Sequence, residues 1–534
     1  MEEFDYIIVG AGSAGCVLAD RLSASGLHRV LLLEAGGSDR RVWIKVPIGY
    51  GRTFLDRRVN WGFTTEPDAG LAGRQGYWPR GRVVGGSSSI NALVYCRGLP
   101  GDFDDWRDAG NPGWGWEDVL PYFERSEKMV DGALSRGTGP LHVADVSREM
   151  HPLSRHYFAA AEELGLRISE DFNGPEPEGV GFYRITTRNG FRCSAADAFL
   201  RPALTRRNLR LRTDALVRRI LFSGRRATGV EYECAGRILS ASARREVILS
   251  AGAVGSPQIL QLSGLGPGAL LQRLGIGVVL DNVNIGGNLQ DHLAVSYYFK
   301  AREPTLNDLL HPWHGKVMAG LRYVLTRRGP LSLSVNQCGG FVRSSPAAAR
   351  PDLQLYFNPI TYAKVTAGRR ERLMLDPYPG FILCFQPTRP TSRGRIDIRS
   401  PKAGDPPSIV PNSLATEKDV QDVIAGGRFM QRIAATSAMR ELIAEAIPPV
   451  LSAMSDADIL EDFRQRCGTV FHPAGTCRMG AEPDGAVVDA RLRVHGTEGL
   501  RVIDASVFPN LTSGNTNAPT IMVAQKGADL VLEG

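Results

Sequence analysis

The sequence predicts a mixed α/β fold, with one domain on a parallel sheet and a second on a mostly antiparallel sheet covered by helices. Three observations predict this fold. A glycine-rich turn joins a buried strand to a helix near the N-terminus, and further apolar strand patterns follow at 246–252 and 500–506. Alternating strand patterns and an amphipathic helix lie between these two segments. A chain of 534 residues that is 43% hydrophobic is long enough for two or three domains.

The first strand, "DYIIVG", leads into a G-x-G-x-x-G turn formed by Gly10, Gly12 and Gly15, and a helix follows. Such glycines permit a tight turn and the close approach of a pyrophosphate, which then faces the helix N-terminus. The next strand, "RVLLLEAG", ends in Glu34, where an acid can accept hydrogen bonds from a ribose hydroxyl. The pattern favours a Rossmann-like dinucleotide site over a turn without a ligand. The acid disfavours NADP and leaves FAD and NAD open.

Charge and composition exclude several classes of partner. The net charge is +7, but the basic residues are spread out, and the densest run, "TRRNLRLR" (205–212), reads as a loop and a strand edge. We therefore expect no nucleic-acid partner. No apolar run approaches a membrane span, and the N-terminus enters a strand directly, so we expect neither a transmembrane segment nor a signal peptide. Eight scattered cysteines without a C-x-x-C pair indicate free thiols and a cytoplasmic location. Peripheral contact with a membrane stays open.

Four long motifs resemble those of one family. "WPRGRVVGGSSSINALVYCRG" (78–98) and "GAVGSPQILQLSGLGP" (252–267) resemble the two signatures of the glucose-methanol-choline (GMC) oxidoreductases, which use FAD. "HPAGTCRMG" (472–480) and "LRVIDASVFPNLTSGNTNAPTIMVAQKGADLV" (500–531) resemble the C-terminal catalytic block of that family. The motifs cover nearly the whole chain in the family's order. The resemblance therefore implies FAD as the cofactor.

The glycine and serine loop at 85–89 can press its backbone against a flat ring and donate hydrogen bonds from its hydroxyls. The resemblance places this loop along the flavin, Asp504 at a ribityl hydroxyl and the backbone of Val217 at the adenine. Ile90 stands where some relatives carry a histidine that bonds FAD covalently, so we expect FAD to be held non-covalently. The residues predicted to hold FAD are Gly10, Gly12, Ser13, Ala14, Gly15, Glu34, Ala35, Val84, Gly85, Ser88, Asn91, Ala92, Leu93, Val94, Val217, Asp504, Ala505, Asn517, Pro519 and Thr520.

His472 is followed by Pro473, which excludes a helix and favours an extended backbone. A histidine held in this way can be a metal ligand, a hydrogen-bonding core residue or a base. No other histidine forms a ligand pair with it in the sequence, so we expect no metal site. The resemblance implies that His472 is the general base of an alcohol oxidation, with the hydride passing to flavin N5. It also implies that Asn515 orients the substrate oxygen.

The segment at 60–81 looks most like the choline-dehydrogenase branch of the family. The acid of choline-specific relatives corresponds here to Gln337, which favours a neutral primary alcohol. Alternatives are a choline dehydrogenase, an oxygen-using alcohol oxidase and, from a different class, an FAD-containing hydroxynitrile lyase. The electron acceptor, oxygen or a quinone-like molecule, stays open.

The motifs divide the chain into two interleaved domains. We expect 1–155, 205–297 and 464–534 to form the FAD-binding domain, and 156–204 and 298–463 to form the substrate domain. In the latter, 351–360 and 380–400 read as alternating strands, with a hairpin turn at "SRG". The helix predicted at 417–435 gathers its apolar residues on one face, namely Val420, Val423, Ile424, Met430, Ile433 and Ala434.

Overall fold

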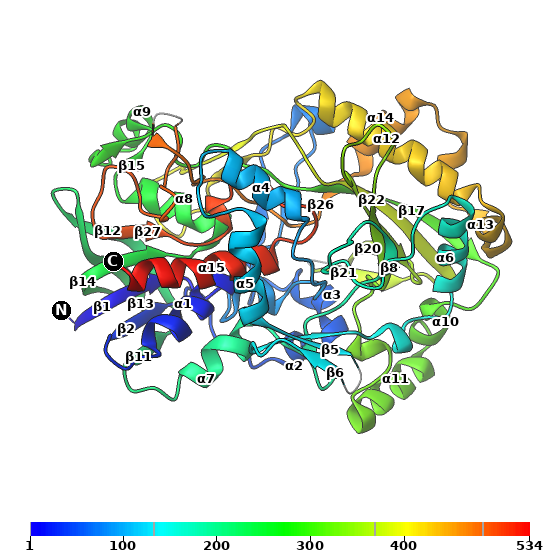
Figure 1. Ribbon diagram of the computed structural model, residues 1–534, viewed down its shortest axis with the longest axis horizontal. Coiled ribbons are helices and arrows are strands. Elements are labelled where there is room, and N and C mark those ends of the chain that lie inside the picture. Colours follow the sequence, from blue (N-terminus) through cyan, green and yellow to red (C-terminus); the bar gives the residue numbers. More distant parts are fainter. Residues whose placement is uncertain (1, 132–133, 368–369, 483–484) are drawn as a thin grey trace.

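A computed structural model describes residues 2–131, 134–367, 370–482 and 485–534. It contains two seven-stranded sheets, which form the left and right halves of the molecule in Figure 1. Both chain termini lie at the outer edge of the left half. This arrangement confirms the mixed α/β fold.

The first sheet assembles strands from three distant parts of the chain around β1. Its order is β11 (Leu209–Arg212), β2 (Val30–Leu33), β1 (Glu2–Val9), β14 (Arg237–Leu249), β13 (Arg226–Cys234) and β12 (Ala215–Ser223), and β27 (Leu500–Val502) also pairs with β14. β1 pairs in parallel with both β2 and β14, and β14 pairs in parallel with β27. The carboxyl ends of these parallel strands meet at one edge, which is where such sheets place ligands.

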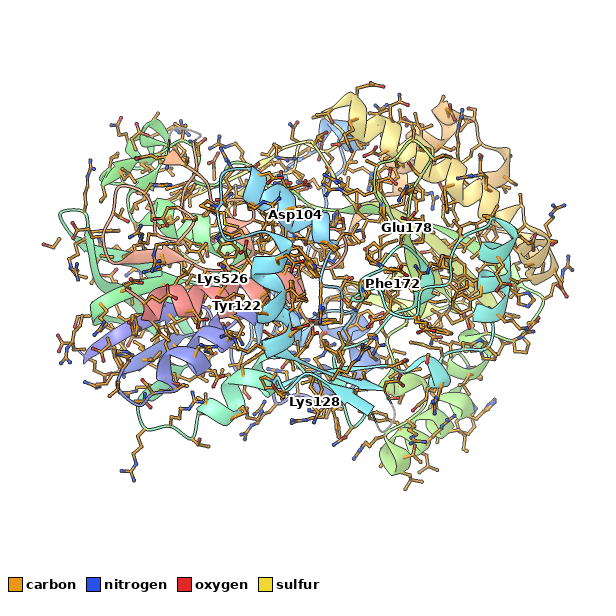
Figure 2. The ribbon with its side chains drawn as sticks, viewed as in Figure 1. Asp104, Tyr122, Lys128, Phe172, Glu178 and Lys526 are labelled. Carbon is orange, nitrogen blue, oxygen red and sulfur yellow. The ribbon has the colours of Figure 1, made fainter. Side chains whose placement is uncertain are left out.

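The last helix, α15 (Asn517–Leu532), packs against α1 (Ser13–Ser23) and α5 (Trp116–Ser126). Arg21 of α1 forms an ion pair with Asp529 at 2.6 Å, and Lys526 lies 5.2 Å from the ring centroid of Tyr122 on α5. Figure 2 shows Lys526 and Tyr122 side by side. This packing brings the start of α15 beside the glycine-rich turn, although hundreds of residues separate them in sequence.

The second sheet is antiparallel at every strand pair. Its order is β25 (Ile443–Ala446), β17 (Leu293–Ala301), β22 (Gly380–Pro387), β19 (Leu353–Asn358), β18 (Cys338–Val342) and β8 (Gly179–Phe182), and β26 (Gly468–Thr469) also pairs with β17. Helix α12 (Glu417–Ala434) covers one face with Val423, Met430 and Ile433, which confirms the predicted amphipathic helix. Because strand side chains alternate, Val295 and Tyr297 of β17 pack on that side, and Ser296 and Tyr298 face a cavity.

Two details predicted for these strands are wrong. No hairpin forms at "SRG": after β22 the chain leaves the sheet, and β23 (Arg395–Asp397) pairs instead with β24 (Ser408–Val410). β19 and β22 also do not alternate between buried and exposed residues, since every residue of β19 is buried. These strands are central, with α12 on one face and the cavity wall on the other, so both faces are covered.

We propose that the chain divides between the two sheets as the sequence suggests. The border expected at 297 falls inside β17, which belongs entirely to the second sheet. β26, from the C-terminal FAD segment, also pairs with β17. The two domains therefore share backbone pairing at this border. Within the described residues, no helix combines the length and the apolar character needed to cross a membrane.

Candidate active site

A cavity of about 1090 Å³ extends from the carboxyl ends of β1 and β2 to the inner face of the second sheet. Val9 and Glu34 line it at one end, and Ser296 and Tyr298 of β17 line it at the other. Single small-molecule sites usually occupy about 300–1,000 Å³. The volume therefore suits an extended cofactor together with a small substrate.

The glycines at the nucleotide end allow close backbone contacts within the first turn and between that turn and the loop at Gly86. A Cβ on Gly15 would lie 1.8 Å from the carbonyl oxygen of Gly10, and one on Gly86 would lie 2.7 Å from Cα of Gly12. Gly10 adopts φ +100°, which favours glycine. No side chain caps α1 at Gly12 or α15 at Thr516, and both residues line the cavity. The positive ends of two helix dipoles are thus available to a negatively charged ligand.

Glu34 lies at the end of β2, buried but lining the cavity. Its carboxylate accepts hydrogen bonds from the backbone N–H of Ala11 at 2.9 Å and of Gly36 at 2.8 Å. Burial raises the pKa of Glu34 to about 7. Each carboxylate oxygen has a second lone pair, so a ribose hydroxyl can still donate to Glu34.

Asp504 follows β27 and ties neighbouring strand ends together. Its Oδ2 accepts from the Gly252 N–H at 2.8 Å and from the Ser256 hydroxyl at 2.6 Å, and Oδ1 accepts from the Ser506 N–H. Burial raises the pKa of Asp504. The residue lines the cavity, and Oδ1 can accept one further hydrogen bond from a ligand hydroxyl.

Most of the residues predicted to hold the cofactor lie in the cavity wall. Those that line it are Gly10, Gly12, Ser13, Ala14, Glu34, Ala35, Asn91, Ala92, Leu93, Val94, Val217, Asp504, Ala505, Asn517 and Thr520. Ser13 donates to Asn517 at 2.8 Å, which joins the starts of α1 and α15. The sequence-based set omitted Gly86, Ser87 and Arg80, which also line the cavity.

Six predicted site residues are not among the described residues that line the cavity, namely Gly15, Val84, Gly85, Ser88, Pro519 and Gln337. Gly15 lies behind the cavity wall, where its lack of a side chain allows α1 to approach the Gly10 carbonyl. Ser88 donates to the Gly85 carbonyl at 2.6 Å and stiffens the loop behind the wall. Gln337 is buried beside β18, and its side-chain oxygen accepts from the backbone N–H of His151 at 2.8 Å. The side chain of Gln337 is therefore engaged outside the cavity wall, next to Val335 and Asn336, which line it.

The loop that carries His472 is pinned to the residues before β17. The backbones of Gln290 and Ala474 exchange two hydrogen bonds of 3.0 Å, and the His472 N–H donates to Asp291 at 2.8 Å. Asp291 also accepts from the hydroxyl of Thr469. These contacts fix the imidazole against the cavity wall, in agreement with the stiff backbone expected at Pro473.

His292 is a direct hydrogen-bond partner of His472 that the sequence did not indicate. The two Nδ1 atoms lie 3.0 Å apart, and Nε2 of His292 lies 2.9 Å from the carbonyl oxygen of Thr388. A carbonyl oxygen only accepts, so His292 carries its proton on Nε2 and offers a lone pair at Nδ1. His472 must then donate from Nδ1. When the ring is neutral, its Nε2 therefore carries no proton and has a lone pair that can accept one.

Asn515 lies at that lone pair. Its Nδ2 is 3.1 Å from Nε2 of His472, and its Oδ1 is buried without a hydrogen-bond partner among the described atoms. Because Nε2 of His472 accepts, the amide nitrogen of Asn515 is the donor. The sequence-predicted pair is therefore brought together in the cavity wall, with one base and one donor side by side.

Burial lowers the pKa of His472 well below its usual value, and His292 and Arg80 lower it further. Burial also lowers the pKa of His292 to about 4. The pKa of His472 therefore lies well below the near-neutral value of an unperturbed imidazole. Both imidazoles are neutral at neutral pH, so the base is already in its proton-accepting form.

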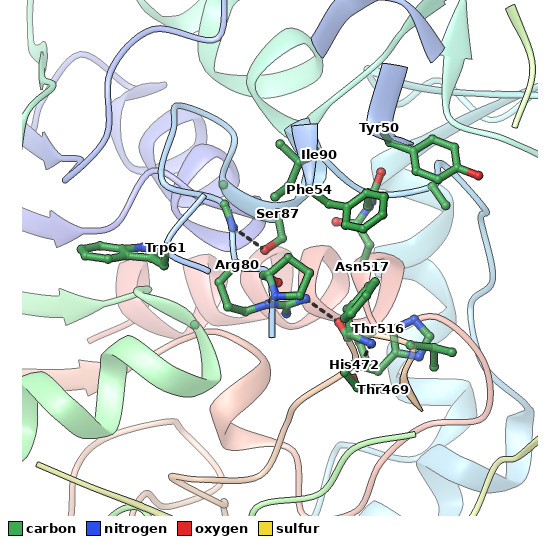
Figure 3. A pocket seen from close by; sticks show the side chains of 18 of the residues that line it. Tyr50, Phe54, Trp61, Arg80, Ser87, Ile90, Thr469, His472, Thr516 and Asn517 are labelled. Atoms are coloured by element: carbon green, nitrogen blue, oxygen red, sulfur yellow. Dashed lines mark hydrogen bonds between the residues drawn. The ribbon is translucent and has the colours of Figure 1, made fainter. Parts of the chain in front are cut away.

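Arg80 is a further cation at the site that sequence reasoning missed. Its guanidinium donates to the Phe471 carbonyl at 2.6 Å, directly before His472, and Figure 3 shows it between Ser87 and His472. Phe471 has φ +70°, a strained conformation that this contact helps to hold. No group of three or more metal-ligating side chains occurs among the described residues.

Replacing His292 by alanine should slow the alcohol oxidation expected of His472 about ten- to a hundredfold. Losing one buried hydrogen bond costs about 1–3 kcal/mol. Without its acceptor, the Nδ1 proton can move to Nε2 and block the lone pair. His292→Asn keeps an acceptor and a donor in nearly the same places and should recover most of the rate. The rate of anaerobic flavin reduction by an alcohol, measured across pH, tests this. Equal rates and equal pH profiles in His292→Ala and the wild type would remove His292 from the mechanism.

Two family models match the chain, both described as GMC oxidoreductase, one over residues 4–294 and the other over residues 390–524. The chain is 42% identical to an oxygen-dependent choline dehydrogenase of Vibrio vulnificus, over 99% of this chain and 94% of that protein. It is also 42% identical to an alcohol dehydrogenase (acceptor) of Pseudomonas putida, over 99% and 96% of the two chains.

The fold has a solved counterpart in pyridoxine 4-oxidase from Mesorbium loti. The TM-score is 0.88 at 32% identity, and the match covers 99% of both chains. These similarities extend over both sheets and over the loops that line the cavity.

Proposed function

Because this chain belongs to the GMC oxidoreductase family, whose members bind FAD, we propose that it oxidises a neutral primary alcohol to the aldehyde with His472 as general base. One observation carries the proposal. The hydrogen bonds from Thr388 through His292 leave a lone pair on Nε2 of His472, beside the amide of Asn515 in the cavity wall.

The residues at the nucleotide end fit FAD. The Gly10, Gly12 and Gly86 backbones and the uncapped helix starts suit a pyrophosphate, and Glu34 suits a ribose. When bound there, FAD supplies the acceptor for the hydride that leaves the carbinol carbon. Ile90 lines the cavity and has no nucleophile, so the cofactor is held non-covalently.

Acid precipitation of the purified holoprotein should therefore release FAD into the supernatant, and the pellet should be colourless. Absorbance spectra of both fractions measure this. Flavin colour retained in the washed pellet would contradict non-covalent binding.

The chain's own groups perform the proton chemistry. The substrate hydroxyl replaces the direct hydrogen bond from Asn515 to His472: it donates to Nε2 of His472 and accepts from Nδ2 of Asn515, which orients the carbinol carbon. As the C–H bond breaks, the hydroxyl proton moves to Nε2, and Asn515 stabilises the charge on the oxygen. His292 and Thr388 prevent His472 from presenting an N–H at this position.

The lining of the cavity supports a neutral substrate. Aromatic rings lie along the substrate end, including Phe54, Tyr298, Tyr356 and Phe471. Among the described residues that line the cavity, only Glu34 and Asp504 are acids, and both lie at the nucleotide end. A quaternary ammonium favours aromatic faces, but the described residues that line the substrate end offer it no carboxylate, since Asp291 lies behind His472 outside the cavity lining.

The test is anaerobic mixing of the holoenzyme with benzyl alcohol, 1-hexanol or choline, followed by flavin absorbance. We expect bleaching with a larger kcat/KM for the neutral alcohols than for choline. A preference for choline would support the choline dehydrogenase alternative. No bleaching by any of the three would overturn the proposed alcohol oxidation.

A further inference from the structure

Helix α11 (Trp313–Thr326) presents its apolar residues to the outside of the molecule. It contacts the protein through a narrow stripe of buried residues, Gly315, Ala319 and Tyr323. Six large apolar side chains are exposed on it, with exposed fractions from 49% to 77%. These six residues, called the α11 outer face below, are Trp313, Val317, Met318, Leu321, Val324 and Leu325.

The outer face lies opposite the buried stripe. With 3.6 residues per turn, positions 315, 319 and 323 fall on one side of the helix, and the six exposed residues spread over the other side. Surface helices of globular proteins normally bury their apolar side and expose a polar one. Figure 1 shows α11 at the lower edge of the right half, beside the short helix α10 (Leu306–Leu310). Such a contiguous apolar surface indicates a binding site.

Cations border the outer face. Lys316 and Arg322 lie at its two margins along the helix, and Arg327 and Arg328 follow at its C-terminal end. In the segment 306–328, Asp308 is the single acid. An apolar face bordered by lysine and arginine is typical of helices that lie in the plane of a membrane, where the long cationic side chains reach the headgroups.

The face also adjoins the cavity. Leu310, His311, Lys316 and Gly320 line the cavity from the inner edge of this region, and exposed Met374 lines it as well. The cavity therefore reaches the surface beside the outer face. A substrate dissolved in a bilayer could enter there without crossing bulk water, a consequence that rests on the proposed function.

We propose that the α11 outer face docks on a lipid bilayer that carries anionic headgroups, with the helix lying parallel to the surface. A second copy of this chain is a poorer occupant. A two-fold contact would bring the same patch against itself, and the bordering cations would then meet cations. Anionic headgroups instead complement Lys316 and Arg322 and receive the apolar side chains between them.

The test uses the FAD-loaded protein and vesicles of phosphatidylcholine with and without phosphatidylglycerol, in a flotation assay. The variant carries Val317→Ser, Leu321→Ser and Val324→Ser, none of which lines the cavity. The matched control carries Leu27→Ser, Ile238→Ser and Val283→Ser, which are similarly exposed on the other half of the molecule. Thermal melting and FAD content confirm that each protein is folded.

The wild type and the control should float with phosphatidylglycerol vesicles, more weakly at high salt, and the α11 variant should bind about tenfold more weakly or worse. Equal binding by the α11 variant and the control would overturn the proposal, as would a wild type that binds neither vesicle. A wild-type dimer that the α11 variant turns into a monomer, seen by light scattering, would assign the face to a second copy instead. Vesicle binding is measured without turnover. The membrane proposal can therefore be contradicted while alcohol oxidation is observed, and alcohol oxidation can be contradicted while vesicle binding is observed.

Discussion

Replacing His472 by alanine should slow anaerobic flavin reduction by a primary alcohol about 10²–10⁴-fold, while the protein stays folded and loaded with FAD. A positioned general base contributes a factor of this size, equivalent to about 3–5 kcal/mol of activation free energy. The hydrogen bond from His472 Nδ1 to His292 leaves a lone pair on Nε2 of His472, which faces Asn515. Stopped-flow absorbance of the flavin measures the loss.

Two controls separate lost base catalysis from a damaged site. Reduction by dithionite needs no protein base and should be unchanged in His472→Ala. His495→Ala removes another partly buried histidine, which contacts the Gly480 carbonyl outside the cavity, and should keep the wild-type rate. A His472→Ala protein that is reduced by alcohol as fast as the wild type would exclude His472 as the base.

Alanine at Gly12 and alanine at Gly15 should have different effects, although both belong to the same motif. A Cβ on Gly15 would meet the Gly10 carbonyl at 1.8 Å, so Gly15→Ala should lower the free energy of unfolding by more than about 4 kcal/mol. A Cβ on Gly12 would meet only the Ser250 carbonyl, at 3.9 Å. Gly12→Ala should therefore fold but bind FAD about a hundredfold more weakly, since the methyl group takes space that the pyrophosphate needs.

Thermal melting of the apoproteins and FAD titration distinguish these outcomes. Gly12→Ala should melt close to the wild type without FAD, and Gly15→Ala should melt far below it or fail to accumulate. Tight FAD binding by Gly12→Ala would mean that the pyrophosphate does not lie at this turn.

The parallel sheet could be predicted because its signals are local. The spacing of Gly10, Gly12 and Gly15 is required by backbone contacts within one turn, and the apolar runs of β14 and β27 are visible in the sequence. Local sequence signals could not show that no hairpin forms at "SRG". The strand pairing there depends on β17 and β19, which lie far away in sequence, rather than on the turn residues.

In the candidate site, the sequence indicated His472 and Asn515 but not the group that controls them. His292 is 180 residues from His472, and the two meet because the backbone of Gln290 pairs with that of Ala474. Nothing in the local sequence of either histidine reports that pairing. For Gln337 the local sequence allows two readings, since a polar residue at a strand start can satisfy a backbone N–H, as it does for His151, as readily as it can face a ligand.

The most direct test of the account is the pH dependence of anaerobic flavin reduction at subsaturating alcohol, in the wild type and in His472→Ala. The neutral form of His472 is the active form, and burial holds its pKa well below the usual 6.5. The wild-type rate should therefore stay constant as the pH falls through about 6.5 and should drop only in more acidic solution. The His472→Ala rate should rise with pH, because alkoxide formed in solution needs no base. Parallel pH profiles for the two proteins would contradict the account.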